Sequence, residues 1–165
     1  MRDGQFEEIL GRMYQRLSTG AARKRIFALR AVKEKRPDLA LLFNAMAESD
    51  EAQSRRLLFL LRGLIGKTEE NVTEIMEKEL PLLQSLYRQL EEEGGRQGMV
   101  SVRHLAGQEA KVGKKNSFLL RKTAGGKSGA AAYHVCSFCG YVHENEAPEA
   151  CPVCQAPQKR FRKIK

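Results

Sequence analysis

All four cysteines of the chain lie within nineteen residues near its C-terminus, in two Cys-x-x-Cys pairs. Each pair suits a tight turn that directs two sulfur atoms at one point, and two such turns complete a tetrahedral four-thiolate site. Iron and zinc both accept these ligands, and the spacing alone does not separate them. The pattern predicts a small metal-binding knuckle around one ion, held by Cys136, Cys139, Cys151 and Cys154. The aromatic residues expected to form its core are Tyr133, Phe138, Tyr141 and Phe161.

No segment of the 165 residues has the pattern of a membrane span or an export signal. Apolar runs stay well short of the roughly 20 residues that a spanning helix needs. The first residues lack the basic-then-apolar order of a signal peptide. In a reducing compartment, clustered cysteines are metal ligands more often than disulfides. We therefore expect a soluble, cytoplasmic protein without a membrane partner.

Apolar residues recur at helical spacing throughout residues 1–121, which predicts a mostly α fold. The expected helices cover about 6–36, 38–66, 68–94 and 98–121, with Gly63, Gly66 and the pair Gly94-Gly95 as stops. Four helices joined by short connections predict an antiparallel four-helix bundle. Residues 122–132 are small and flexible in composition and are expected to form a linker. Residues 133–165 then form the knuckle, with short β hairpins and a basic tail.

The formal charge of +9 is concentrated at the C-terminus, because residues 155–165 carry five basic residues and no acidic one. Such a segment can attract acidic proteins or nucleic acid. The simpler interpretation is a frayed, solvated tail.

The knuckle also carries a Cys-Gly-Tyr-x-His-Glu stretch from Cys139, an Ala-Pro-Glu-x-Cys-Pro-x-Cys stretch ending at Cys154, and the late Phe161. With these motifs, residues 133–161 resemble the rubredoxin-type tail of rubrerythrins. That family has a four-helix domain before this tail, so the resemblance covers nearly the whole chain. It implies a ferritin-like four-helix bundle followed by a rubredoxin-like domain, and it favours iron over zinc. Gln155 departs from the family, which usually has glycine there.

The same resemblance implies a di-iron site inside the bundle, where rubrerythrins reduce peroxide with carboxylate and histidine ligands. The positions of this sequence that match those ligands are Thr19, Asp50, Gln53, Lys78, Pro81, Gly113 and Asn116. Only one of them is a carboxylate, and one carboxylate cannot offset the charge of two irons. We therefore expect the di-iron site to be lost. A register shift of one turn on the third helix would instead offer Glu74 and Glu77, which are otherwise solvated glutamates.

These observations leave three functions open. The first is a rubrerythrin-like iron-binding protein that transfers electrons through its four-cysteine centre, in oxidative-stress defence, with a redox partner protein and as a homo-oligomer. The alternative is a zinc knuckle whose basic tail contacts an acidic protein or nucleic acid, although the aromatic residues are assigned to the core, which disfavours nucleic acid. The third is a full peroxidase, against which the lost ligands argue. Enzymatic activity itself stays undecided at this point.

Overall fold

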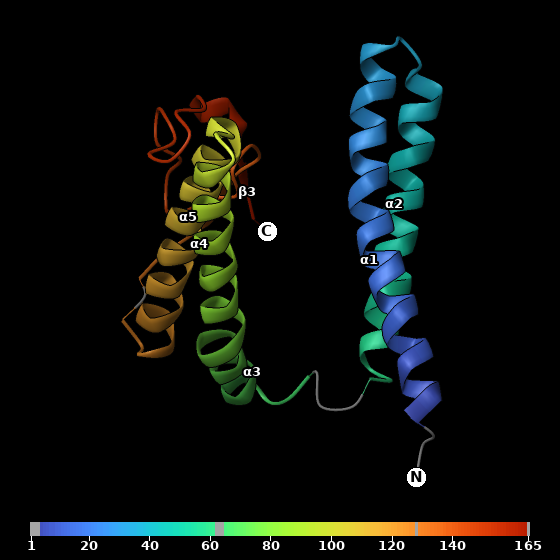
Figure 1. The fold of residues 1–165 in the computed structure, drawn as a ribbon, viewed down its shortest axis with the longest axis horizontal. Coiled ribbons are helices and arrows are strands. Elements are labelled where there is room, and N and C mark those ends of the chain that lie inside the picture. Colours follow the sequence, from blue (N-terminus) through green and yellow to red (C-terminus); the bar gives the residue numbers. More distant parts are fainter. Residues whose placement is uncertain (1–3, 62–64, 128, 165) are drawn as a thin grey trace. The chain divides into compact units, whose positions relative to one another are not determined.

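The computed structural model describes residues 4–61, 65–127 and 129–164. The chain divides into two compact units, Met1–Lys67 and Thr68–Lys165. Figure 1 shows a helical hairpin in the first unit, and a second hairpin with the C-terminal strands in the other. In the described parts of the chain, none of the helices is long and apolar enough to cross a membrane.

The first unit is a hairpin of two long helices, α1 (Gly4–Lys33) and α2 (Pro37–Leu58). Small side chains lie where the two helices meet, and small residues allow helix axes to approach closely. The buried alanines are Ala21, Ala28, Ala31, Ala40 and Ala47. The sequence placed the end of the second helix at Gly63 and Gly66, but α2 already ends at Leu58, and Gly63 lies outside the described residues.

The second unit begins with one helical run made of α3 (Thr68–Glu74), a π-helical turn η1 (Ile75–Glu79) and α4 (Leu80–Arg96). The π turn was not expected from periodicity. Its cause lies in Pro81, which has no N–H for the carbonyl of residue 77 and whose ring would collide with that carbonyl in a regular α-helix. The wider turn relieves the collision, and the Leu80 N–H donates to the Ile75 carbonyl instead.

The pair Gly94-Gly95 was expected to stop the third helix, but α4 continues to Arg96. A side chain at Gly94 would lie 3.1 Å from the Arg103 amide nitrogen and 3.3 Å from Val102 Cγ1. Glycine therefore serves here to bring the start of α5 (Val100–Ala124) close to α4. The expected linker begins late, since residues 122–124 are still helical.

The chain ends in a three-stranded antiparallel sheet of order β2-β1-β3. Its strands are β1 (Tyr133–Cys136), β2 (Val142–Glu144) and β3 (Phe161–Lys163), and the short 3-10 turn η2 (Gln158–Arg160) precedes β3. The basic tail is therefore not frayed: Arg162 pairs with Val135 and Lys163 with His134 in the register of β3 on β1.

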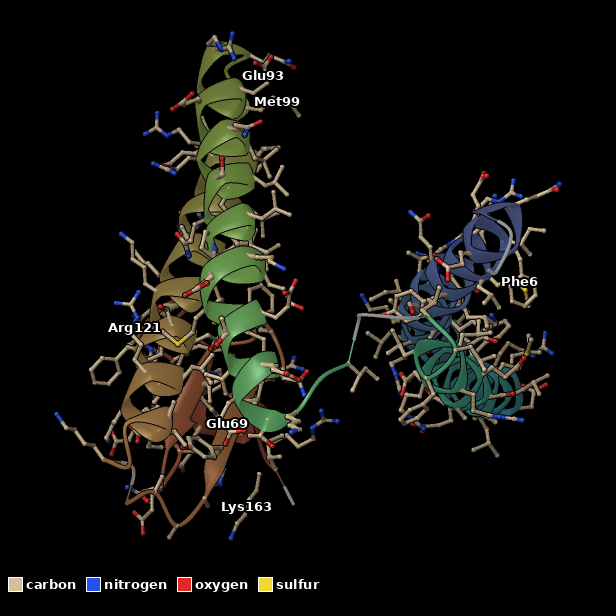
Figure 2. The ribbon with its side chains drawn as sticks, turned by 90° about the horizontal axis from the view of Figure 1, so that it is seen from below. Phe6, Glu69, Glu93, Met99, Arg121 and Lys163 are labelled. Atoms are coloured by element: carbon tan, nitrogen blue, oxygen red, sulfur yellow. The ribbon has the colours of Figure 1, made fainter. Side chains whose placement is uncertain are left out.

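The sheet lies beside α5 (Figure 2), and the four cysteines pack on this helix. Val112 of α5 is buried in one cluster with the cysteines. The Glu144 carboxylate on β2 lies 2.8 Å from Lys122 Nζ and 3.9 Å from Lys115 Nζ, and all three side chains are largely shielded from solvent. The knuckle and the α4–α5 hairpin thus share an apolar contact and an ion-pair contact.

Candidate metal centre

Two short loops of the same design carry the cysteines. In the first loop the Cys136 N–H donates to the Tyr141 carbonyl at 2.9 Å, and the Gly140 N–H donates to the Cys136 carbonyl at 2.9 Å. In the second loop the Cys151 N–H donates to the Ala156 carbonyl at 2.8 Å, and the Gln155 N–H donates to the Cys151 carbonyl at 2.9 Å. The loops therefore repeat one local geometry, which the Cys-x-x-Cys spacing alone is enough to predict.

The loops bring the four sulfur atoms to within 4.8 Å of one another. Cys136 Sγ lies 3.7 Å from Cys154 Sγ, and Cys139 Sγ lies 3.6 Å from Cys151 Sγ. Disulfide sulfurs lie about 2.0 Å apart, so these are free thiols. Four sulfurs at about 2.3 Å from one ion in a tetrahedron would be about 3.8 Å apart. The sulfur positions therefore fit one four-coordinate iron or zinc ion, as the sequence predicted.

The thiols lie in a small apolar core made by residues of both loops, β3 and α5. Cys136, Cys139 and Cys151 are buried, and Cys154 is partly accessible. Tyr141 and Phe161 pack against them as expected. The prediction that Phe138 belongs to this core is wrong, since its side chain is 74% exposed. Val112 takes part in the core instead, and no local sequence signal pointed to it because it lies more than twenty residues earlier in the chain.

Burial raises the pKa values of these thiols, whereas hydrogen bonds from backbone amides lower them. Burial raises the pKa of Cys139 far above its usual range, and burial also raises the pKa of Cys154. Burial opposes ionisation of Cys136 too, but hydrogen bonds from the backbone amides of Cys139 and Phe138 and from the thiols of Cys154 and Cys139 together outweigh it and lower that pKa. Without metal, Cys139 and Cys154 therefore keep their protons, and a metal ion must displace them.

We expect metal affinity to rise steeply with pH for this reason. Because binding releases protons from Cys139 and Cys154 at least, the affinity should increase by at least about a hundredfold per pH unit between pH 5 and 7, one factor of ten for each proton released. Competition with a chelator of known pH dependence measures this slope. An affinity that stays constant over this range would contradict the proton balance.

Gln155 occupies a backbone conformation that favours glycine. Its φ is +62°, and Gly140 at the equivalent place in the first loop has φ +77°. The left-handed region costs a residue with a Cβ about 1 kcal/mol. We expect Gln155→Gly to stabilise the loop by about that amount, which would slow metal loss to a chelator about fivefold. The control Gln155→Ala keeps the Cβ atom and should not stabilise the loop. Faster metal loss from the glycine variant would contradict the prediction that the backbone at Gln155 is strained.

Within each of the two units taken by itself, the described positions that match the di-iron ligands do not form a second cluster of donors. Within the residues that the structure describes, the four cysteines are the only group of three or more possible metal ligands. Asp50 pairs with Lys24 across the α1–α2 contact, so a cation of the protein already occupies its carboxylate. The Thr19 hydroxyl donates to the Gln15 carbonyl of its own helix at 2.7 Å.

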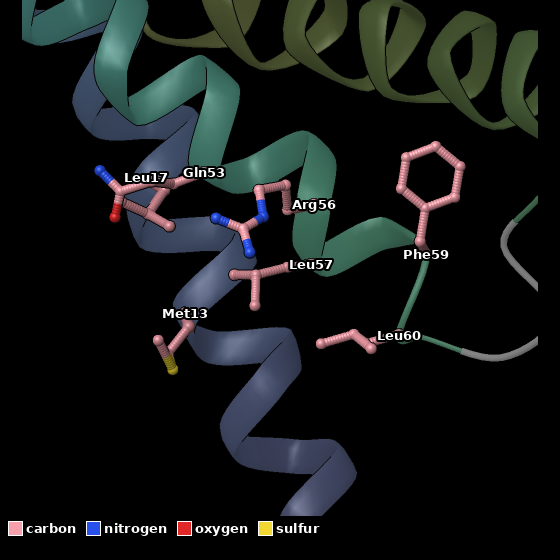
Figure 3. Close-up of a pocket in the computed structure, with 7 residues that line it drawn as sticks. All are labelled: Met13, Leu17, Gln53, Arg56, Leu57, Phe59 and Leu60. Atoms are coloured by element: carbon pink, nitrogen blue, oxygen red, sulfur yellow. The ribbon is translucent and has the colours of Figure 1, made fainter.

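Gln53 and Lys78 also have ordinary partners, whereas the buried Asn116 Oδ1 has no hydrogen-bond partner among the described residues. Gln53 donates to the Ser49 hydroxyl at 3.2 Å and lines a pocket between α1 and α2 with Met13, Leu17 and Arg56 (Figure 3). Lys78 Nζ lies 2.6 Å from the Glu74 carboxylate. Glu74 is one of the two glutamates that a shift of one turn offered as metal ligands, and it is therefore already ion-paired. Pro81 and Gly113 line another pocket. The side chain of Gln84 also lines this pocket and lies close to Gly113.

Comparison with known proteins shows what the cysteine segment and the fold are similar to. A family model for the rubredoxin-like domain of rubrerythrin matches residues 134–162, which include all four cysteines. A solved structure of nigerythrin in its fully reduced, all-ferrous state is 17% identical, with 99% of this chain and 89% of that chain covered and a TM-score of 0.52. Nigerythrin in a mixed-valence state is 19% identical over 99% and 88% of the two chains, with a TM-score of 0.47. No curated protein matches the chain.

The resemblance to rubrerythrins that the sequence predicted is therefore confirmed, for the C-terminal segment by the family match and for the fold by the likeness to nigerythrin. The predicted fold class is confirmed as well: helices dominate, and a small antiparallel sheet follows them.

Proposed function

We propose that this chain is a rubrerythrin-like iron protein that transfers single electrons through the centre held by Cys136, Cys139, Cys151 and Cys154. The observation that carries the proposal is the convergence of four thiols at tetrahedral spacing inside a segment that matches a rubredoxin-like domain. Iron bound by four thiolates supplies a one-electron couple, and its potential depends on burial and on hydrogen bonds to sulfur.

The residues of the two loops have defined parts in this function. Backbone amides of Phe138 and Cys139 donate to the Cys136 sulfur, and the Ala156 amide donates to the Cys154 sulfur. These bonds stabilise negative charge on sulfur and so adjust the potential of the bound ion. The three buried cysteines keep water away from the site, and the partly accessible Cys154 offers the shortest route for an electron to the surface.

A role in oxidative-stress defence follows as part of the same proposal. With its carboxylate positions replaced, this chain would deliver electrons to a partner and not reduce peroxide itself. A cytoplasmic location suits the proposal, because a reducing compartment keeps the four thiols available for metal.

Metal analysis of protein purified without added metal tests this proposal. We expect about one iron per chain, a red colour in air, and reversible bleaching with dithionite. Zinc in place of iron and a colourless protein would contradict electron transfer and favour the zinc-knuckle alternative, whose ligands would be the same four cysteines.

We also propose that the chain forms a homo-oligomer. Each hairpin, taken by itself, leaves large apolar side chains exposed, among them Phe6, Met13, Leu82 and Leu86. Exposed apolar patches of this kind mark interaction surfaces. Light scattering of the purified protein should give a mass of at least two chains, and a monomer at micromolar concentration would contradict this proposal.

A further inference from the structure

A pocket lies between α5 and the second cysteine loop of the knuckle. On α5 it is lined by Arg103, His104, Gly107 and Lys111, and from the knuckle Val153 contributes one wall. Val153 stands between Cys151 and Cys154 and packs against the cysteine cluster. The pocket therefore reaches a residue that directly precedes Cys154 and lies two positions after Cys151.

The charge of this pocket is positive. Arg103 and Lys111 supply two exposed cations of the lining, and Glu91 supplies its single carboxylate. Among the described residues, neither Arg103 nor Lys111 lies within ion-pair distance of a carboxylate. Some other cations of the same unit are paired, among them Lys115 and Lys122 with Glu144, and Arg96 with Glu93.

Helical spacing explains how the pocket arises. Arg103, Gly107 and Lys111 are four residues apart, so they lie on one stripe of α5. Gly107 has no side chain between the two cations, which leaves a hollow there. Val100 and Val153 add apolar surface to the lining. Apolar side chains next to charged ones are a usual composition of a protein-docking site.

We infer that this pocket, which we call the Arg103–Lys111 pocket, is the docking site of an acidic redox protein that exchanges electrons with the four-cysteine centre. Charge complementarity selects a carboxylate-bearing partner. Nucleic acid fits less well, because single strands bind on aromatic stacking platforms and the pocket lining has no phenylalanine, tyrosine or tryptophan. The inference rests on the proposed electron-transfer function for its biological purpose, but the binding itself can be tested without iron.

The first experiment measures binding on zinc-loaded protein with a hexaglutamate peptide at about 20 mM salt, where charges interact over more than 10 Å. Amide NMR shifts should concentrate on Gly107, Gln108 and Val153. The variant Arg103→Glu with Lys111→Glu should bind at least about tenfold more weakly. The control Lys114→Glu with Arg121→Glu makes the same charge change on the same helix, at the pocket of Pro81 and Gly113, and should bind as the wild type does.

Two results would overturn the inference. One is an equal loss of peptide binding in both double variants, which would mean that overall charge and not this pocket attracts the peptide. The other is a single-stranded decanucleotide that binds through the same residues more than tenfold more tightly than the peptide, which would assign the pocket to nucleic acid. Hexalysine should cause no shifts in the wild type.

The second experiment follows electron transfer from reduced, iron-loaded protein. One electron passes to ferricyanide, which becomes ferrocyanide, and neither a proton nor an iron–sulfur bond takes part. At low salt the Arg103→Glu, Lys111→Glu variant should react about tenfold more slowly with anionic ferricyanide and faster with the cation tris(phenanthroline)cobalt(III). If the substitutions changed the reduction potential of the iron centre instead, the rates with both oxidants would rise together or fall together. Rates that change in the same direction would therefore overturn docking at this pocket. If the protein bound no iron, only the proposed electron-transfer function would be refuted. The peptide-binding experiment would still test the pocket as a docking site.

Discussion

Replacing Cys151 with serine should remove most of the bound metal and unfold the C-terminal knuckle. The Cys151 side chain is fully buried, and its N–H and carbonyl both hold the second loop through Ala156 and Gln155. Serine cannot supply a thiolate, and residues 133–161 have little apolar core without the ion. The metal provides about 10–16 kcal/mol of folding free energy in small domains of this type, so the loss of one of four ligands should be decisive.

The effect of Cys151→Ser should extend into α5. Val112 packs against the cysteine cluster, and unfolding of the knuckle would expose it to water. Faster amide hydrogen exchange in α5 near Val112, together with loss of the β1–β2 pairing, measures this coupling. The control Ser137→Ala changes an exposed side chain of the first loop and should keep both metal and exchange rates. Full metal occupancy in the serine variant would refute the assignment of the site.

Peroxide turnover should be absent, and the metal content should stay at about one ion per chain. Two irons need several anionic ligands, and of the seven matching positions only Asp50 is a carboxylate. Lys24 already neutralises it. Even changes in the residues around metal ligands cost about 10–100-fold in affinity or activity, so replacement of the ligands themselves should abolish a second site.

Helix α5 gives a further reason, beyond the sequence, to expect that the di-iron site is lost. A Cβ atom at Gly113 would lie 2.2 Å from Gln84 Nε2, which donates to the Ala110 carbonyl at 3.1 Å. A ligand side chain at position 113 would therefore require Gln84 to move. We expect no single substitution to restore the site for this reason.

The measurement compares anaerobic peroxide consumption by the reduced wild type, by the Cys136→Ser variant and by free iron. We expect no turnover beyond the single electron stored in each four-cysteine centre, whose closed set of ligands has no position for peroxide. About three irons per chain with rapid, sustained turnover would restore the peroxidase interpretation.

The sequence by itself was enough to predict that the four cysteines form one cluster and that helices dominate. Both depend on short-range geometry: the Cys-x-x-Cys loops are closed by hydrogen bonds within six residues, and apolar spacing along α1 or α5 reveals a helix without its neighbours. Gln155 was recognised as a departure from the resemblance to rubrerythrins, before its positive φ was known.

Only the tertiary structure decided which residues surround the centre. It placed Val112 against the cysteines, turned Phe138 outward, built β3 from the basic tail, and brought Arg103 and Lys111 beside Val153. Each of these features joins residues far apart in the chain or depends on what another segment covers. Periodicity and spacing carry no information on such contacts, because burial is decided by the packing of whole elements against one another.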